Sequence, residues 1–93
     1  MPRLVAEWRE DIDALQFAAV DHGGVCVIHR LAFRSLLGFT PQREDCLAYF
    51  TMHSVAFDAA ASAKIAAANI PPGRSFHLNS RDVSRQLNAA KTL

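Results

Sequence analysis

The sequence has few residues that ligate metals or form disulfides. Only two of its 93 residues are cysteines. Cys26 and Cys46 lie in apolar segments and belong to no CxxC pair or Cys/His cluster at metal-ligand spacing. Isolated cysteines of this kind are typical of small core residues in a reducing compartment. We therefore expect two buried free thiols, with a disulfide or a redox role as the alternative.

Long hydrophobic runs are also missing. No apolar run approaches the roughly 18 residues that a membrane span needs. The start of the chain, Met1-Pro2-Arg3, leads into charged residues and has no signal-peptide core. We therefore expect a cytoplasmic protein that does not engage a membrane.

Catalytic motifs are absent as well. The chain has no GxSxG elbow, P-loop, dinucleotide-binding glycine pattern or HExxH. Its four histidines are the obvious acid/base candidates near neutral pH. His29 and His77 are expected on one outward sheet face, where a metal would still lack its third and fourth ligands. We expect His22 to be exposed in a turn and His53 to lie at the edge of a helical stripe. The sequence thus predicts no enzyme, catalytic residue, metal or cofactor.

The length allows one domain, because so short a chain can close only one core. We take residues 1–93 as that domain, with 1–12 as an N-terminal segment and 88–93 as a frayed tail. Apolar residues make up 51% of the chain, but 16 of them are alanines, which bury little area each.

The formal net charge of +1 hides an uneven distribution. Residues 1–28 carry five acidic and two basic side chains, whereas residues 59–93 carry five basic and one acidic. Such ends can attract one another within the fold or between two copies, while a dedicated nucleic-acid binder usually has a large basic excess. The distribution disfavours nucleic acid as a partner.

Alternating apolar residues predict strands at 14–20, 25–29 and 75–79, with a hairpin turn at 21–24. One face of this sheet is expected to bear Leu15, Phe17, Cys26, Ile28, Phe76 and Leu78. On the other face we expect Val20, Val25 and Val27 beside His29 and His77. That second face is apolar enough to require a cover, either the N-terminal segment with Leu4, Val5 and Trp8 or a second copy.

Helical spacing predicts three further elements. Leu31 to Leu37 form a short amphipathic helix that Gly38 ends. Thr40 and Pro41 are predicted to be the cap and the first residue of a long helix that runs to Ala68. A final short helix is expected over 81–87, with Ser80 as its cap.

The long helix is too long for its core. About 26 continuous helical residues span about 39 Å, whereas a compact chain of this size has a diameter of roughly 32 Å. The helix should therefore kink near Ser62, fray at its end or pack against another copy. Seven of the ten residues from Ala59 to Ala68 are alanine, which permits close backbone approach. The candidate self-association residues are Val25, Val27, Ala59, Ala63 and Ala66.

The order strand, strand, helix, helix, strand, helix predicts an α+β fold. We expect a small, largely antiparallel three-stranded sheet with the long Ala-rich helix packed on one face.

The stretch from Trp8 to Leu87 resembles a family of small bacterial proteins, the domain-of-unknown-function family 1488. The matching features are Trp8, Phe17-Ala18-Ala19, the turn 21–24, Val25-Cys26-Val27-Ile28, Leu37-Gly38, the Ala-rich helix 44–68 and Phe76-His77-Leu78. The sequence departs from the family pattern at His22 and Gly23, and at 29–32, where a serine cap and acidic residues are replaced. The resemblance implies a compact bacterial α+β domain and transfers no catalytic residue.

Two functions remain open. The favoured one is a non-enzymatic interaction module that forms a homodimer or binds another protein, because it needs only the long helix, the apolar sheet face and the opposite charges. The alternative is a polyanion- or nucleic-acid-binding accessory protein, which requires two groups of arginines to converge. The arginines of that candidate site are Arg30, Arg34, Arg74, Arg81 and Arg85.

Overall fold

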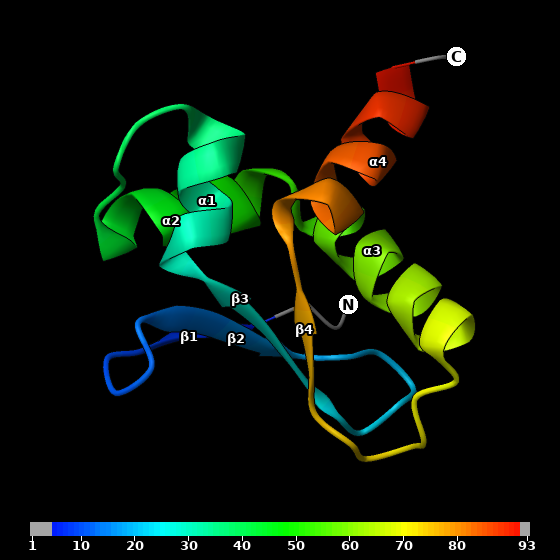
Figure 1. Ribbon diagram of the computed structural model, residues 1–93. Coiled ribbons are helices and arrows are strands. Elements are labelled where there is room, and N and C mark those ends of the chain that lie inside the picture. Colours follow the sequence, from blue (N-terminus) through cyan, green and yellow to red (C-terminus); the bar gives the residue numbers. More distant parts are fainter. Residues whose placement is uncertain (1–4, 92–93) are drawn as a thin grey trace.

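The computed structural model describes residues 5–91. The elements, in chain order, are β1 (Ala6–Arg9), β2 (Ala14–Ala18), β3 (Val25–His29), α1 (Arg30–Leu37), α2 (Arg43–Met52), α3 (Ser54–Ala68), β4 (Phe76–Leu78) and α4 (Ser80–Lys91). Figure 1 shows these helices on one side of the sheet. The predicted α+β class is confirmed.

Within residues 5–91 the sheet has four strands in the order β1-β2-β3-β4. β2 pairs antiparallel with both β1 and β3, whereas β4 runs parallel to β3. The expectation of three largely antiparallel strands is therefore wrong in detail. The chain leaves β3, passes through three helices on one face and returns to the same edge, and a crossover of this kind delivers the next strand in the parallel direction.

The additional strand, β1, lies inside the predicted N-terminal segment 1–12. It extends the sheet at its edge through pairs such as Trp8 with Leu15. Trp8 packs against the core on the helical side, and the guanidinium of Arg30 lies 5.0 Å above its ring. Val5 is exposed, and Leu4 lies outside the described residues. In the described residues this segment therefore widens the sheet and does not cover its outer face.

The core lies between the sheet and the helices. All six residues expected to face inward are buried, with Phe76 the most exposed of them at 7%. Phe50 links sheet and helices, because its ring centroid is 5.0 Å from that of Phe17 and 5.1 Å from that of Phe57. Alternation along the strands thus predicted the buried face correctly.

The long helix is divided in two at His53, whose φ of −115° and ψ of 29° interrupt the helical geometry. A kink near Ser62 was one of the three expected outcomes, and the break lies instead at His53. Just before the break, the Thr51 hydroxyl donates a 2.9 Å hydrogen bond to the carbonyl of Leu47, a contact that bends helices. The longest extent of the molecule is 37 Å, and the two shorter helices fit within it.

The helix starts also differ from the predictions. Gln42, rather than Thr40, precedes the first residue of α2, and its N–H donates to the carboxylate of Asp45 at 2.9 Å. Asn79, rather than Ser80, caps α4, because its amide oxygen accepts the N–H of Asp82 at 2.9 Å. α4 continues past the expected end to Lys91, and Figure 1 shows it pointing away from the sheet. The end of α1 at Gly38, with φ of 83°, is as predicted.

Candidate interaction site

An apolar groove lies where the α2–α3 junction meets the C-terminal half of α4. Its volume is about 450 Å³. We call it the α3–α4 groove, and its lining residues are Met52, His53, Val55, Ala56, Ala59, Gln86, Leu87 and Ala89. The lining contains no aspartate, glutamate, lysine or arginine, so it offers apolar contact without a fixed charge.

Met52 and Val55 line this groove, one on either side of the helix break at His53. Both lie at the surface, with exposed fractions of 76% and 84%. Val55 is the most exposed large hydrophobic residue in the described part of the chain. Ala56 and Ala59, both on α3, line the groove next to Met52 and Val55. Their side chains are small, so they leave a hollow in the surface. Protruding apolar side chains therefore stand beside a depression that could receive similar ones.

The structure separates the five candidate self-association residues. Ala59 lines the groove, whereas Ala63 and Ala66 are exposed farther along α3. Val25 is half-buried. Val27 is only 7% exposed, so it offers little surface to a partner. Sequence periodicity missed most of the groove, because its lining depends on how α4 packs against α3.

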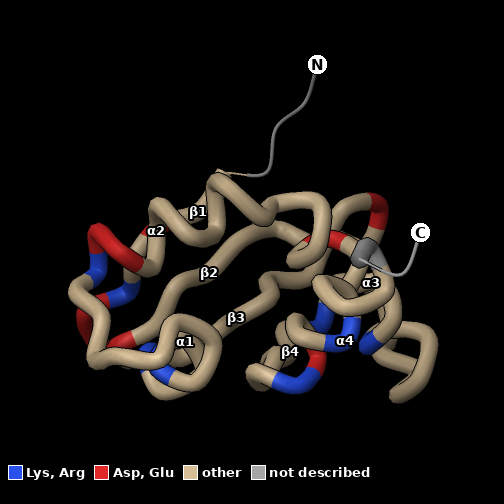
Figure 2. The backbone as a smooth tube through the Cα atoms, turned by 90° about the horizontal axis from the view of Figure 1, so that it is seen from above, with Lys and Arg blue, Asp and Glu red and all other residues tan. Residues whose placement is uncertain are grey.

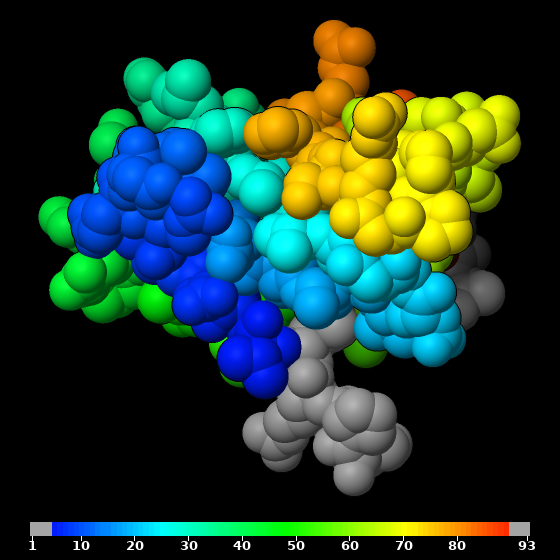
Figure 3. Space-filling model, turned by 90° about the horizontal axis from the view of Figure 1, so that it is seen from below, coloured from blue at the N-terminus to red at the C-terminus, as the bar shows by residue number. Residues whose placement is uncertain are grey.

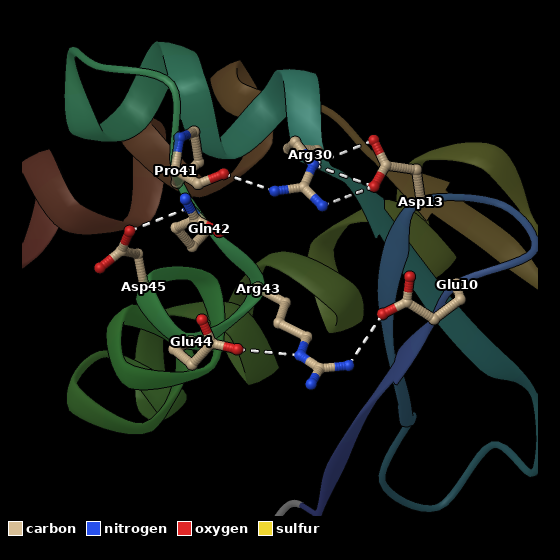
Figure 4. A network of polar contacts seen from close by, with 8 residues as sticks. All are labelled: Glu10, Asp13, Arg30, Pro41, Gln42, Arg43, Glu44 and Asp45. Carbon is tan, nitrogen blue, oxygen red and sulfur yellow. Dashed lines mark hydrogen bonds and ion pairs between the residues drawn. The ribbon is translucent and has the colours of Figure 1, made fainter.

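A network of ion pairs joins the β1–β2 loop to the starts of α1 and α2 (Figure 4). Arg30 lies 2.8 Å from the carboxylate of Asp13 and also donates to the carbonyl of Pro41. Arg43 bridges Glu10 at 2.9 Å and Glu44 at 2.8 Å. The acidic front of the chain thus pairs with arginines of its middle. Arg30 is already held by these contacts, which leaves it poorly placed to bind an anion.

The hydrogen bonds from Arg30 hold the pKa of the Asp13 carboxyl below its ordinary value, and desolvation opposes them. Both partners are partly exposed, so solvent screens the pair. The network positions the β1–β2 loop and the starts of α1 and α2 rather than a reacting group.

The other arginines of the candidate anion site have different surroundings. Arg34, Arg74, Arg81 and Arg85 are exposed and form no ion pair within residues 5–91. Asp82, the acidic neighbour of Arg81 and Arg85, forms an ion pair with Lys64 at 3.1 Å. Figure 2 shows basic segments gathered at α4 beside β4, apart from those at α1. The described structure therefore leaves a basic surface on α4.

The four histidines occupy distinct sites. His22 is half-buried rather than exposed, which corrects the prediction, because its ring packs edge-on against Phe76 with centroids 5.8 Å apart. His29 and His77 lie side by side, with ring planes that differ by 7°. His53 lines the groove, and its ring centroid is 4.5 Å from that of Tyr49.

Both cysteines are free and fully buried. Burial raises the pKa of the Cys26 thiol to about 12 and that of the Cys46 thiol to about 11. Thiols held in their neutral form are poor nucleophiles. The expectation of two core thiols is confirmed, and neither is suited to redox chemistry in the folded chain.

No group of three or more histidine, cysteine, aspartate or glutamate side chains within residues 5–91 is arranged to hold a metal ion. Within the same residues, no helix is both long and apolar enough to cross a membrane.

Fold and site together define a small α+β domain with helices on one face of a mixed sheet and an apolar groove at the helical end. No protein-family model, curated protein or solved structure matches the chain. The resemblance to family 1488 therefore stays a prediction.

Proposed function

We propose that the protein is a self-associating module and that two copies dimerise through the α3–α4 groove. The observation that carries this proposal is the pairing of Met52 and Val55, two large exposed side chains, with the alanine-lined hollow beside them. In a two-fold dimer the same surface serves both partners, so it must be complementary to itself. A surface that contains both the protrusion and the hollow meets this condition.

The lack of charged side chains in the groove lining also favours a second copy of the chain as the partner. A two-fold axis brings equivalent residues of the two copies close together, so a face with one sign of charge repels its own copy. The groove lining carries no aspartate, glutamate, lysine or arginine. The charged network at Glu10, Asp13, Arg30 and Arg43 lies at other elements, in the β1–β2 loop and at the starts of α1 and α2.

The area involved implies a weak dimer. Full burial of an exposed valine or methionine contributes about 1.5–3 kcal/mol, whereas association costs about 4–15 kcal/mol. Four such side chains across the interface, two from each copy, contribute about 6–12 kcal/mol, which is of the same size as the cost of association. We expect dissociation in the micromolar range or above, which corresponds to about −8 kcal/mol or weaker.

A small apolar molecule is the main rival occupant, since ligand pockets have volumes of about 300–1,000 Å³. Such pockets usually place several polar groups around the ligand to orient it. Here the polar side chains are His53 and Gln86, and neither is fully buried. A second copy needs no oriented polar contact, so it suits this lining better.

Amide chemical shifts, measured as the protein is diluted, test the surface directly. Dimerisation through the groove predicts concentration-dependent shifts over 52–59 and 86–89, with no change at Val25 and Val27. Shifts confined to the outer sheet face, or none between about 1 mM and 20 μM, would overturn the proposal.

A second function, binding of a polyanion, is supported by one observation. Lys64 pairs with Asp82 and thereby leaves Arg81 and Arg85 without an acidic partner on α4. Salt-sensitive retention on heparin that disappears in the Arg81→Ala/Arg85→Ala variant would support this function. Failure to bind heparin at low salt would exclude it.

A further inference from the structure

The face of the sheet opposite the helices carries two neighbouring imidazoles. Figure 3 shows this face, with the strands exposed across its middle from β1 in blue, through β3 in cyan, to β4 in yellow-orange. His29 ends β3 and His77 is the central residue of β4. Both side chains are exposed.

The parallel register places them together. Val27 pairs with His77, and His29 lies two residues beyond Val27 on the same face. The two ring centroids are 5.1 Å apart, and the ring planes differ by 7°. Adjacent, hydrogen-bonded strands hold both residues, so the backbone keeps the two side chains next to each other.

The separation fits two ligands of one metal ion. An imidazole nitrogen binds zinc at about 2.0–2.1 Å, so two rings on one tetrahedral ion have their centroids about 5 Å apart. The terminal torsion of histidine has broad minima, and rotation about it turns the ring nitrogens while the ring centre stays nearly in place. The rings can therefore point one nitrogen each at a shared ion without movement of the strands.

We propose that His29 and His77 form a binding site for a late first-row divalent cation such as Zn²⁺ or Cu²⁺. Neutral imidazoles are preferred ligands of these ions. The Asp13 carboxylate is close enough to His29 to interact with it electrostatically. It is held by Arg30, however, so it is not a third ligand. Water completes the coordination shell, which is possible because the site is open to solvent. Two ligands on one chain bind as a chelate, so the loss of either removes most of the affinity.

Titration of the full, tag-free chain with ZnCl₂, followed by calorimetry and by the imidazole NMR signals, tests the site. We expect the His29 and His77 signals to shift together. His29→Ala and His77→Ala should each weaken zinc affinity at least about tenfold. His53→Ala is the matched control, because His53 lies in the α3–α4 groove on the helical side, and it should leave the affinity unchanged.

The unfolding midpoint of each variant without metal establishes that it is folded, and we expect it to match that of the unmodified chain. Zinc binding that survives either His29→Ala or His77→Ala would overturn the site. Weakening by His53→Ala to the same extent, or no binding to the unmodified chain at millimolar zinc, would also overturn it.

Discussion

The imidazole Nε2 of His22 lies 3.0 Å from the carbonyl oxygen of Ile70, 48 residues farther along the chain. The other ring nitrogen, Nδ1, accepts the N–H of Gly24 at 3.3 Å. Because Nδ1 accepts, the hydrogen of the neutral ring is on Nε2, and this N–H donates a hydrogen bond to the carbonyl of Ile70. The N–H of Gly73 also donates to the backbone carbonyl of His22, at 2.8 Å. His22 therefore links the β2–β3 turn to the loop that follows α3.

Replacement of His22 by alanine tests this link. The buried Gly24 would lose the acceptor of its N–H, and an unsatisfied buried donor costs about 1–3 kcal/mol. We expect the free energy of unfolding, measured with urea at pH 7, to fall by this amount. His77→Ala, at an exposed position, should change it by less than about 0.5 kcal/mol. Equal effects of the two substitutions would contradict the link.

Gly24 should tolerate no side chain. A Cβ there would lie 2.2 Å from the carbonyl oxygen of Arg74 and 2.8 Å from Nδ1 of His22, so backbone would have to move. Gly38 has a positive φ of 83° but open space around a Cβ, so substitution there costs only backbone strain. We expect Gly24→Ala to cost about 3 kcal/mol and Gly38→Ala about 1 kcal/mol. Denaturant unfolding checks the order, and the reverse order would refute this explanation.

The aromatic core provides a test of the inward-facing assignment. Phe17 and Phe57 are exposed by only 2% and 0%. Truncation of either ring to alanine should cost about 3–5 kcal/mol, because it removes a large buried side chain and leaves a cavity. A loss below about 1 kcal/mol in urea unfolding would mean that the ring is not buried as described.

The Asp13–Arg30 pair predicts part of the acid sensitivity. A carboxyl whose folded-state pKa is lowered stabilises the fold above its unfolded value, about 3.9. That contribution is lost as the pH falls through the lower, folded-state pKa. Asp13→Asn should therefore reduce stability near neutral pH and flatten its decline below about pH 4. Urea unfolding across this range measures both effects.

Asp21→Asn is the control for this acid effect, since Asp21 forms no ion pair within the described residues. It should leave the decline below about pH 4 as steep as in the unmodified chain. If Asp13→Asn retains the same slope as well, the ion pair with Arg30 is not responsible.

Local pattern predicted much of the fold. The β2–β3 hairpin and α1 follow from alternation, turn glycines and helical spacing, which depend on neighbours in the chain. β1 was missed because the segment Ala6–Arg9 has no β-branched residue and becomes a strand only by pairing with β2. The parallel direction of β4 depends on the path of three helices, which no local pattern encodes.

The candidate site was less predictable than the fold. Ala59 was identified from the alanine-rich stretch, and it does line the groove. Met52 and Val55 were missed because they lie off the apolar stripe of the predicted helix, where a single exposed apolar residue gives no sign of a hollow beside it. Gln86 and Leu87 join them only through the packing of α4 on α3. Sequence periodicity alone could not have brought these residues together.

The mass of the protein in solution, determined by sedimentation equilibrium from about 20 μM to 1 mM, tests the proposed dimer most directly. We predict that the mass rises with concentration from the 10.2 kDa of one chain towards twice that value. Val55→Asp should hold it at one chain, because it places a charge in the apolar contact. Val20→Asp, at a residue 53% exposed and outside the groove, should leave the rise intact. A constant mass of one chain throughout, or an equal loss of the rise in both variants, would contradict dimerisation through the α3–α4 groove.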